Sequence, residues 1–468
     1  MIHLKTLNPT RLAFKLAIST LLTWGGKQGA NGGGAEITTL ASFSSSNGAG
    51  PYAGLLLGQD GNFYGTTYQG GTNGLPLGYG TAFKLTPSGA LTTLVCFNNS
   101  NGAKPYAGLV QAADGNLYGV TWQGGASNLG VLFRLTTNGN LTPMLSFTGA
   151  NGAKPSGRLL YGANGLLYGT TQSGGTSNLG TVFQTTTNGV LNPLVSFNGT
   201  NGANPYAGLM LGADGHLYGT TVNGGLMGKG TAFRVTTNGV LTTLISFAIT
   251  NGTYPYGGLV QDVTGDLYGT TAYGGTYNAG TIYRLTTNGT LTTLYSFTGG
   301  IDGANPWASL IRGRDGHFYS TTILGGASIG VNGWGTIFQI MTNGTFTSLL
   351  AFAVDDNGIS PYSDLVQDAT GHFYGTTFSL GAGLKGTVFK INATPGDLPS
   401  PSVVGNSLRV NWNAWPGISY QVQYKTNLNQ GGWLDLGGAI IATNGAMNVS
   451  DPIVGGTRCY RVKQLSVP

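Results

Sequence analysis

The side chains best suited to acid–base or metal chemistry are scarce in this sequence, and most of them share one setting. The chain has 468 residues but only 15 acidic residues and four histidines, and Glu36 is its only glutamate. Acid–base and glycosidase chemistry usually needs paired carboxylates or histidines. His216, His317 and His372 each follow the glycine of an expected hairpin turn, in three different repeats. A ring of repeats would hold equivalent positions apart, so we interpret these histidines as polar turn residues rather than a metal cluster.

The aspartates show the same tendency. Four of them occupy an Asp-Gly turn, namely Asp60, Asp114, Asp214 and Asp315. An aspartate in such a turn bonds to its own backbone, which favours a local structural role over catalysis or metal binding. The sequence contains no serine nucleophile elbow, phosphate-binding loop or Cys-x-x-Cys pair. We therefore expect no catalytic residue, no metal and no cofactor.

An aromatic residue that follows proline recurs along the chain and could bind a ligand. The series is Tyr52, Tyr106, Tyr206, Tyr256, Trp307 and Tyr362, and Ser156 takes its place in the third repeat. Around the mouth of a channel, such residues could stack on sugar faces or on apolar ligands. The alternative is that each ring packs between neighbouring repeats.

Departures from the repeat are more informative than the repeat itself. Most repeats place glycine three residues after the proline, but the third has Arg158, the sixth has Ser309 and the seventh has Asp364. In a ring of seven, Arg158 and Asp364 would bring opposite charges to the channel entrance from nearly opposite sides. A second variable position is aromatic in contiguous repeats one, two and seven, as Tyr68, Trp122 and Phe378. We place the candidate ligand site near these residues; ordinary drift at exposed positions is the alternative.

Seven tandem repeats of about fifty residues must position these side chains. A tyrosine in a Leu-Tyr-Gly-Thr-Thr motif or a close variant marks each one, at positions 64, 118, 168, 218, 268, 319 and 374. Each repeat holds four short strand-like segments joined by Asp-Gly, Gly-Gly and Asn-Gly turn signals. Four antiparallel strands in every fifty residues or so are typical of a β-propeller blade.

The two ends of the array favour a closed ring. The last repeat ends after the segment 386–391 without a fourth strand, and a matching strand stands before the first complete repeat, at 37–43. That strand would complete the last blade and hide an edge otherwise open to pairing. We therefore predict an all-β chain: a seven-bladed β-propeller closed by an N-terminal strand, followed by a small β-sandwich.

The boundaries follow from changes in composition. Residues 1–35 have the layout of an export signal, with basic residues, a short apolar stretch and a run of small residues, although a disordered leader is the alternative. The propeller is expected at 36–394 and a proline-bounded linker at 395–401. Residues 402–468 resemble a fibronectin type III-like β-sandwich, with Trp412 and Tyr420 as its core aromatics.

The repeat motif resembles a known family. The unit runs Asp-Gly-x-Leu-Tyr-Gly-Thr-Thr, then Gly-Gly, then Gly-Thr-x-Phe-x-Leu-Thr-Thr-Asn-Gly-x-Leu-Thr-Thr-Leu-x-Ser-Phe. It is similar to the choice-of-anchor tandem repeat family named for gloeobacteria and verrucomicrobia, over about residues 36–392. The C-terminal segment, with Tyr420 and Trp433, resembles a module at the ends of bacterial exported proteins. These resemblances imply secretion or surface display, in the extracellular space or at the cell surface, and bring no activity.

Composition narrows the partners. Charged residues make up 8% of the chain, the net charge is +6, and no cluster of lysine and arginine forms a stripe, which argues against a nucleic-acid partner. No apolar run is long enough to span a membrane. We expect a monomeric, exported, non-enzymatic module that binds a glycan or a surface protein. The alternatives are a polysaccharide lyase or hydrolase that uses Asp364, and a structural or adhesive module without a small ligand.

Overall fold

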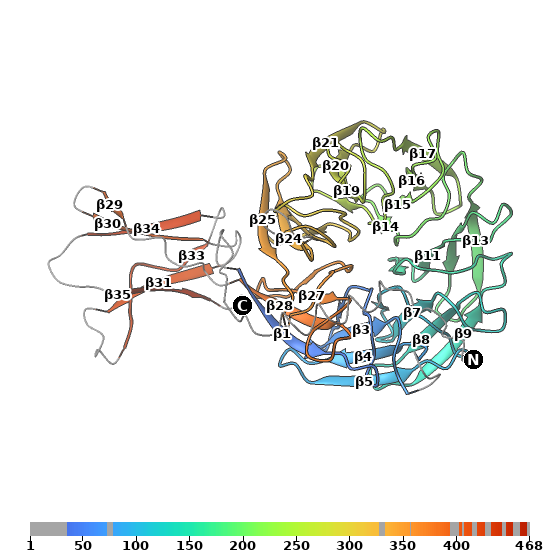
Figure 1. The fold of residues 1–468 in the computed structure, drawn as a ribbon, viewed down its shortest axis with the longest axis horizontal. Helices are drawn as coiled ribbons and strands as arrows, with labels where there is room; N and C mark the ends of the chain where they lie inside the picture. Colours follow the sequence, from blue (N-terminus) through green and yellow to red (C-terminus); the bar gives the residue numbers. More distant parts are fainter. Residues whose placement is uncertain are drawn as a thin grey trace, which may run out of the picture. The chain divides into compact units, whose positions relative to one another are not determined.

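The computed structural model describes residues 35–72, 78–326, 333–355, 357–393, 402–404, 407–413, 419–425, 432–441, 446–452 and 459–465. Every regular element in these ranges is a β-strand (Figure 1). Over the same ranges there is no helix of the length and apolar character that crossing a membrane requires. The expected leader, apart from its last residue, and the expected linker at 395–401 lie outside the described residues.

The repeats fold into seven four-stranded antiparallel sheets, numbered here in chain order. Sheet 1 contains β2 (Leu56–Leu57), β3 (Phe63–Thr67), β4 (Thr81–Leu85) and β5 (Leu91–Cys96); sheet 2 contains β6 (Val110–Gln111), β7 (Leu117–Thr121), β8 (Val131–Leu135) and β9 (Leu141–Ser146); sheet 3 contains β10 (Leu160–Tyr161), β11 (Leu167–Thr171), β12 (Thr181–Thr185) and β13 (Leu191–Ser196). Sheet 4 contains β14 (Met210–Leu211), β15 (Leu217–Thr221), β16 (Thr231–Val235) and β17 (Leu241–Ser246); sheet 5 contains β18 (Val260–Gln261), β19 (Leu267–Thr271), β20 (Thr281–Leu285) and β21 (Leu291–Ser296); sheet 6 contains β22 (Ile311–Arg312), β23 (Phe318–Thr322), β24 (Thr336–Ile340) and β25 (Phe346–Ala351). Sheet 7 contains β26 (Val366–Gln367), β27 (Phe373–Thr377), β28 (Thr387–Ala393) and β1 (Ala35–Ser42).

Sheet 7 takes its fourth strand from the start of the chain. β1 pairs antiparallel with β28, with Ile37 opposite Ile391 and Ser42 opposite Thr387. The strand predicted to supply the missing segment therefore does so. Without it, the backbone groups of β28 would form an unpaired edge.

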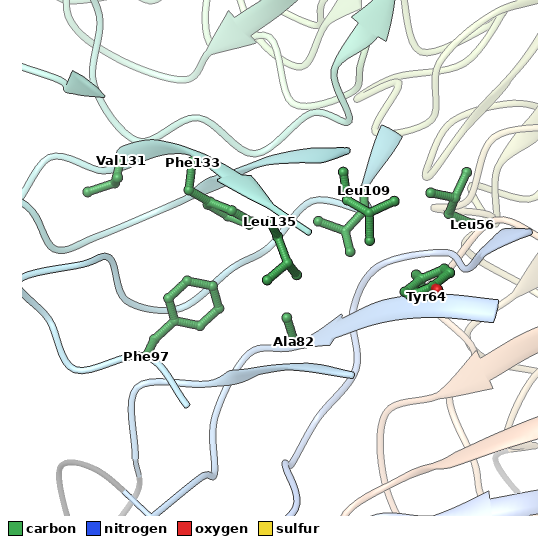
Figure 2. Close-up of a cluster of buried hydrophobic side chains, with 9 residues drawn as sticks. Leu56, Tyr64, Ala82, Phe97, Leu109, Val131, Phe133 and Leu135 are labelled. Atoms are coloured by element: carbon green, nitrogen blue, oxygen red, sulfur yellow. The ribbon is translucent and has the colours of Figure 1, made fainter. Parts of the chain in front are cut away.

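The sheets pack face to face through buried side chains. Figure 2 shows one such layer, in which Leu56, Tyr64 and Ala82 of sheet 1 lie near Leu109 and Phe133 of sheet 2. The second strand of every sheet is buried at all five positions, because a neighbouring sheet covers each of its faces. Its small residues make room for aromatic rings on the next strand.

Hydrogen bonds also join each sheet to its neighbour. A threonine of the second strand donates its hydroxyl to a backbone carbonyl of the following sheet in six of the seven cases. These are Thr66 to Ala107 at 3.0 Å, Thr170 to Ala207 at 2.9 Å, Thr220 to Gly257 at 3.0 Å, Thr270 to Ala308 at 3.1 Å, Thr321 to Pro361 at 3.1 Å and Thr376 to Ala53 at 3.3 Å. The last of these runs from sheet 7 to sheet 1. Sheet 2 has Val120 at this position, and its contact with sheet 3 is apolar there.

The C-terminal residues form two further sheets. One contains β29 (Ser402–Val404), β30 (Ser407–Asn413) and β34 (Ala446–Pro452); the other contains β31 (Ser419–Lys425), β32 (Leu434–Asp435), β33 (Ile440–Ile441) and β35 (Cys459–Gln464). Val410, Tyr420 and Val422 are their buried core. Tyr420 therefore has the core position expected for it, whereas the side chain of Trp412 lies outside the description.

Candidate ligand-binding site

A tight turn before each first strand sets the position of the post-proline aromatics. In sheet 2, the N–H of Lys104 donates to the carbonyl of Tyr79 in sheet 1 at 2.7 Å, and the carbonyl of Lys104 accepts from Trp122 at 3.1 Å. To make both bonds, the residue before the proline adopts a positive φ, of 52° at Lys104. The equivalent residues do the same, at Gly50, Lys154, Asn204, Tyr254, Asn305 and Ser360. The turn therefore has the same conformation in every repeat and places the residue two positions later in an equivalent position each time.

Eight side chains meet at this end of the sheets and are called the aromatic cluster: Tyr52, Tyr68, Tyr106, Tyr206, Tyr256, Trp307, Tyr362 and Phe378. The ring centroids lie 4.4 Å apart for Tyr52 and Tyr106, 5.3 Å for Tyr106 and Tyr206, 5.1 Å for Tyr206 and Tyr256, 4.0 Å for Tyr256 and Trp307, 5.4 Å for Trp307 and Tyr362, and 5.0 Å for Tyr362 and Tyr52. The six post-proline rings thus contact one another in a closed cycle. All eight side chains remain partly exposed.

The three aromatic residues of the second variable position, Tyr68, Trp122 and Phe378, differ in their place: two belong to the cluster and one lies outside it. Tyr68 and Phe378 both contact Tyr52, at 5.4 and 4.5 Å between ring centroids. Trp122, by contrast, has no ring partner among the described residues. Its Nε1 donates to Gln172 Oε1 at 3.1 Å, and the ammonium of Lys154 lies 5.1 Å from its ring centroid.

Polar groups of the cluster remain able to bond a ligand. Trp307 Nε1 is buried and has no hydrogen-bond partner in the described part of the chain. Burial, and then the nearby Tyr362, raise the pKa of Tyr52 to about 12. Burial likewise raises the pKa of Tyr106 and Tyr206. The tyrosine hydroxyls therefore stay neutral at physiological pH and can both donate and accept.

Behind the cluster, seven equivalent positions form a narrow layer, called the waist: Gly54, Gly108, Arg158, Gly208, Gly258, Ser309 and Asp364. Strands crowd here, because a Cβ atom on Gly208 would stand 2.4 Å from the carbonyl oxygen of Arg158. Only three of the seven positions carry a side chain.

The waist separates two cavities. One, of about 170 Å³, is lined by the six post-proline rings and by the residues of the waist other than Gly258. The other, of about 920 Å³, is lined by the first strands and the hairpins that follow them. Arg158, Ser309 and Asp364 line both. Arg158 and Asp364, which were expected at the channel entrance, stand two residues before the first strands β10 and β26 and line both cavities, behind the aromatic rings.

Asp364 is bonded mainly to its neighbour in the waist. Its Oδ1 accepts from the N–H of Ser309 at 2.6 Å, and Ser309 Oγ accepts from the N–H of Gly258 at 2.9 Å. Burial raises the pKa of Asp364, while the bonds from Ser309 and the charge of Arg158 partly offset this. Arg158 shares the waist with Asp364, but no ion pair joins them within the described residues.

The hairpin acids have the local role expected from their turns. Each accepts a hydrogen bond from the buried tyrosine of its own repeat: Tyr64 to Asp60 at 2.7 Å, Tyr118 to Asp114 at 2.7 Å, Tyr218 to Asp214 at 2.6 Å, Tyr268 to Asp262 at 3.0 Å, Tyr319 to Asp315 at 2.5 Å and Tyr374 to Asp368 at 2.9 Å. The three hairpin histidines pair with the acids of their own turns, at 2.9, 3.1 and 3.5 Å. Within the described residues, no three potential metal ligands come together.

Sequence reasoning missed two residues that line the larger cavity, Tyr161 and Arg312. Both are on first strands, at a position where the residue type varies between repeats without an obvious pattern. A signal was present, because glutamine recurs there as Gln111, Gln261 and Gln367. Its meaning depends on contacts between sheets, which no single repeat reveals.

Comparison with known proteins gives one family and several similar folds. The Gloeobacter/Verrucomicrobia repeat matches residues 28–167, 74–265, 143–330 and 210–402. None of the curated proteins matches the chain. Among solved structures, the BP39L lectin from Burkholderia pseudomallei is 10% identical, with a TM-score of 0.49 over 78% of this chain and 97% of that one. A proposed 6-phosphogluconolactonase from Bacteroides fragilis NCTC 9343 is 15% identical, with a TM-score of 0.43 over 85% and 98%. Puromycin hydrolase is 13% identical, with a TM-score of 0.46 over 80% and 61%.

Proposed function

The chain belongs to the Gloeobacter/Verrucomicrobia repeat family, and we propose that it is an exported, non-enzymatic module that binds carbohydrate at the aromatic cluster of a closed seven-bladed β-propeller. The observation that carries the proposal is the convergence of eight partly exposed aromatic side chains at one end of the sheets. Such rings are the usual partners of the apolar faces of sugars.

Contacts between the first and last sheets support the closed ring. The N–H of Gly50 in sheet 1 donates to the carbonyl of Lys385 in sheet 7 at 2.9 Å, as Lys104 of sheet 2 does to Tyr79 of sheet 1. Thr376 of sheet 7 donates to Ala53 of sheet 1 in the same way as the other seam threonines. The junction between the ends of the array therefore repeats the internal junctions.

The polar groups of the cluster support a sugar over a purely apolar ligand. Trp307 supplies a ring N–H that has no partner among the described residues, and the neutral tyrosine hydroxyls supply donors and acceptors. Lys104 lies over the ring of Tyr68 at 5.6 Å, at the edge of the cluster. Apolar rings with a few placed polar groups are what a sugar needs for orientation as well as affinity.

A glycan array, followed by calorimetry with the sugars that bind on the array, tests this proposal. We expect Tyr52→Ala and Trp307→Ala to weaken binding at least tenfold, because each removes a ring that stacks on the ligand. Tyr277→Ala is the matched control, since Tyr277 is 61% exposed and is outside the cluster. Intact protein that binds no glycan, or cluster variants that bind as well as the Tyr277 variant, would contradict it.

A structural role for the cluster is the second candidate, because the rings also pack on one another. Tyr256 and Trp307 stack at 4.0 Å with 9° between their planes, and Tyr52 and Tyr106 stack at 4.4 Å. If adhesion or stability is the whole purpose, Trp307→Ala will lower the melting temperature while no sugar binds the parent protein. Glycan binding together with an unchanged melting temperature would exclude this candidate.

The export part of the proposal rests on the leader at residues 1–35. Residues 402–468 would then form a separate fibronectin type III-like module after the linker at 395–401. Fractionation of cells that express the full chain or a chain lacking residues 2–34 tests the leader. We expect only the full chain outside the cytoplasm, and equal export of both would refute the assignment.

A further inference from the structure

The larger cavity lies on the far side of the waist from the aromatic cluster and has a different character. It measures about 920 Å³, and its charged lining residues are Arg158, Arg312, Asp262 and Asp364. This volume is within the range of small-molecule sites. The aromatic cluster is absent from its lining, so a ligand in this cavity would contact a different set of side chains.

A glutamine that recurs at the end of the first strand forms hydrogen bonds between adjacent sheets. Gln111 of sheet 2 accepts from the N–H of Gln59 in the hairpin of sheet 1 at 2.9 Å and donates to the carbonyl of Gly115 in its own hairpin at 2.9 Å. Gln261 and Gln367 make the same two bonds to the hairpins beside them. In three of the seven sheets, a glutamine at this position therefore joins adjacent sheets.

Four sheets depart from this pattern. Sheets 1 and 4 carry Leu57 and Leu211 where the glutamine stands. Sheets 3 and 6 carry Tyr161 and Arg312 there, and both of these side chains line the cavity. Across the described ranges, no hydrogen bond involves the Tyr161 hydroxyl or the Arg312 guanidinium. Among the four sheets without the glutamine, sheets 3 and 6 are those with a polar side chain there, and within the described ranges each presents a donor without a protein partner to the cavity.

Arg158 is the third such group. It stands in the waist where four repeats have glycine, and its side chain is exposed to the channel. The surrounding protein lowers the pKa of its guanidinium, and Asp364 opposes this effect. An arginine stays protonated under such conditions. No hydrogen bond to it is formed in the described part of the chain, so its planar set of donors is available.

The two carboxylates of the lining are already engaged by the protein. Asp364 accepts from Ser309, and Asp262 accepts from Tyr268 at 3.0 Å and Thr264 at 2.7 Å. Neither arginine has a comparable partner in the ranges that the structure describes. The unsatisfied groups of the cavity are therefore donors, and two of the three carry positive charge.

We propose that this cavity binds a small molecule through an oxyanion, a carboxylate or a phosphate, held by Arg158 with Arg312 and Tyr161 as further donors. A guanidinium matches the geometry of both oxyanions, because it can give two parallel N–H bonds to one group. The site is separate from the aromatic cluster and does not depend on carbohydrate binding there.

Calorimetry on the full chain at low ionic strength tests this site, with inorganic phosphate and glucuronate as the two probes. Arg158→Gly is the main variant, since glycine is the residue of four other repeats and should preserve the fold. Loss of a charged hydrogen-bond donor should weaken binding by about tenfold or more. Whichever probe binds the parent protein more tightly identifies the oxyanion.

Arg314→Ala is the matched control, because it removes the same charge from a neighbouring hairpin that does not line the cavity. We expect this variant, and Trp307→Ala, to bind the probe as the parent does. Arg312→Ala gives an independent reading if Arg158→Gly lowers the melting temperature, and it should weaken binding severalfold.

Three results would overturn the proposal: no binding of either probe by the parent protein, unchanged binding by both cavity variants, or an equal loss in the Arg314 variant. Trp307→Ala separates this site from the proposed carbohydrate site. If the parent protein binds neither probe but Trp307→Ala abolishes glycan binding, only the cavity proposal is overturned. If the probe binds and the cavity variants weaken it but no glycan binds, only the carbohydrate proposal is overturned.

Discussion

At the scale of single residues, the most regular polar contact is the bond from a buried tyrosine to its hairpin acid. In the first repeat, burial alone would raise the pKa of Asp60, but bonds from Tyr64, Asn62 and Lys84 outweigh it and lower the pKa to about 2. The acids Asp114, Asp214, Asp262 and Asp368 are lowered in the same way. An acid with a lower pKa in the folded state stabilises the fold above its unfolded pKa, and that stability disappears as the pH falls towards the folded value.

Asp60→Asn should therefore lower the melting temperature at pH 6 by a few degrees. The fold should tolerate asparagine, since Asn164 occupies this place in sheet 3 and donates to Tyr168 at 2.8 Å. The difference between variant and parent should shrink as the pH falls from about 4 towards 2, because the carboxylate of the parent becomes protonated. Thermal unfolding across this range measures it, and a difference independent of pH would contradict the assigned cause.

Asp364 should behave in the opposite way. Burial raises its pKa, so the folded state favours the protonated form, and ionisation destabilises the fold as the pH rises through the raised value. Asp364→Asn keeps an oxygen for the Ser309 N–H and removes the charge. We expect a higher melting temperature than the parent at pH 7 and no difference below about pH 4. A lower melting temperature at pH 7 would mean that attraction to Arg158 outweighs burial.

At the scale of elements, the spacing between first strands decides which residues the waist can hold. The strands approach most closely at Gly208, where an added Cβ would lie 2.4 Å from a backbone oxygen of Arg158. At Gly258, in the same layer, an added Cβ meets nothing closer than 3.4 Å. The two positions have the same residue in sequence but different room around it.

Gly208→Ala should destabilise the fold by about 1–3 kcal/mol, the usual range for overpacking, because backbone must move to admit the methyl group. Gly258→Ala is the control in the same layer and should change stability by less than about 1 kcal/mol. Chemical denaturation of both variants measures the difference. Equal effects would show that the strands of the waist can shift at little energetic cost.

The sequence predicts the elements well and the contacts between them poorly. Turn signals such as Asp60-Gly and the recurring Tyr-Gly-Thr-Thr strands are local features of the sequence. Because the same pattern recurs in each repeat, the order of the strands can be predicted from the sequence alone. The mutual contact of Tyr52 with Tyr362, 310 positions apart in the numbering, depends on how seven sheets converge. The depth of Arg158 and the unoccupied donors of Tyr161 and Arg312 depend on neighbouring sheets in the same way.

At the scale of the whole molecule, stability depends on a contact between the two ends of the array. β1 and β28 pair along seven residue pairs, and sheet 1 meets sheet 7 through Gly50 and Thr376. Every other junction joins segments that are neighbours in sequence. This junction joins residues more than 300 positions apart. Loss of β1 would therefore disrupt the contact between the first and last sheets and not the structure of a single repeat.

Removal of residues 35–42 should therefore expose the edge of β28 and lower the melting temperature of the seven-sheet part by ten degrees or so, with association through the open edge. Size-exclusion chromatography and thermal unfolding measure the two effects. Removal of residues 395–468 is the control and should leave that transition in place. A monomeric variant with an unchanged transition would show that β1 adds little to the ring.

The pairing of β1 with β28 also implies a delay during biosynthesis, because the two strands are synthesised at different times. β1 is made early, but its partner, Thr387–Ala393, follows about 350 residues later. At about 5–20 residues per second, the ribosome needs roughly 20–70 s to reach it. Sheets 1 to 6 can form in turn as they emerge, each on the one before, while β1 waits with its hydrogen-bonding groups unpaired. The nascent chain therefore passes through a long period in which an early strand is open to wrong partners, and a factor that shields residues 35–42 would act during that period.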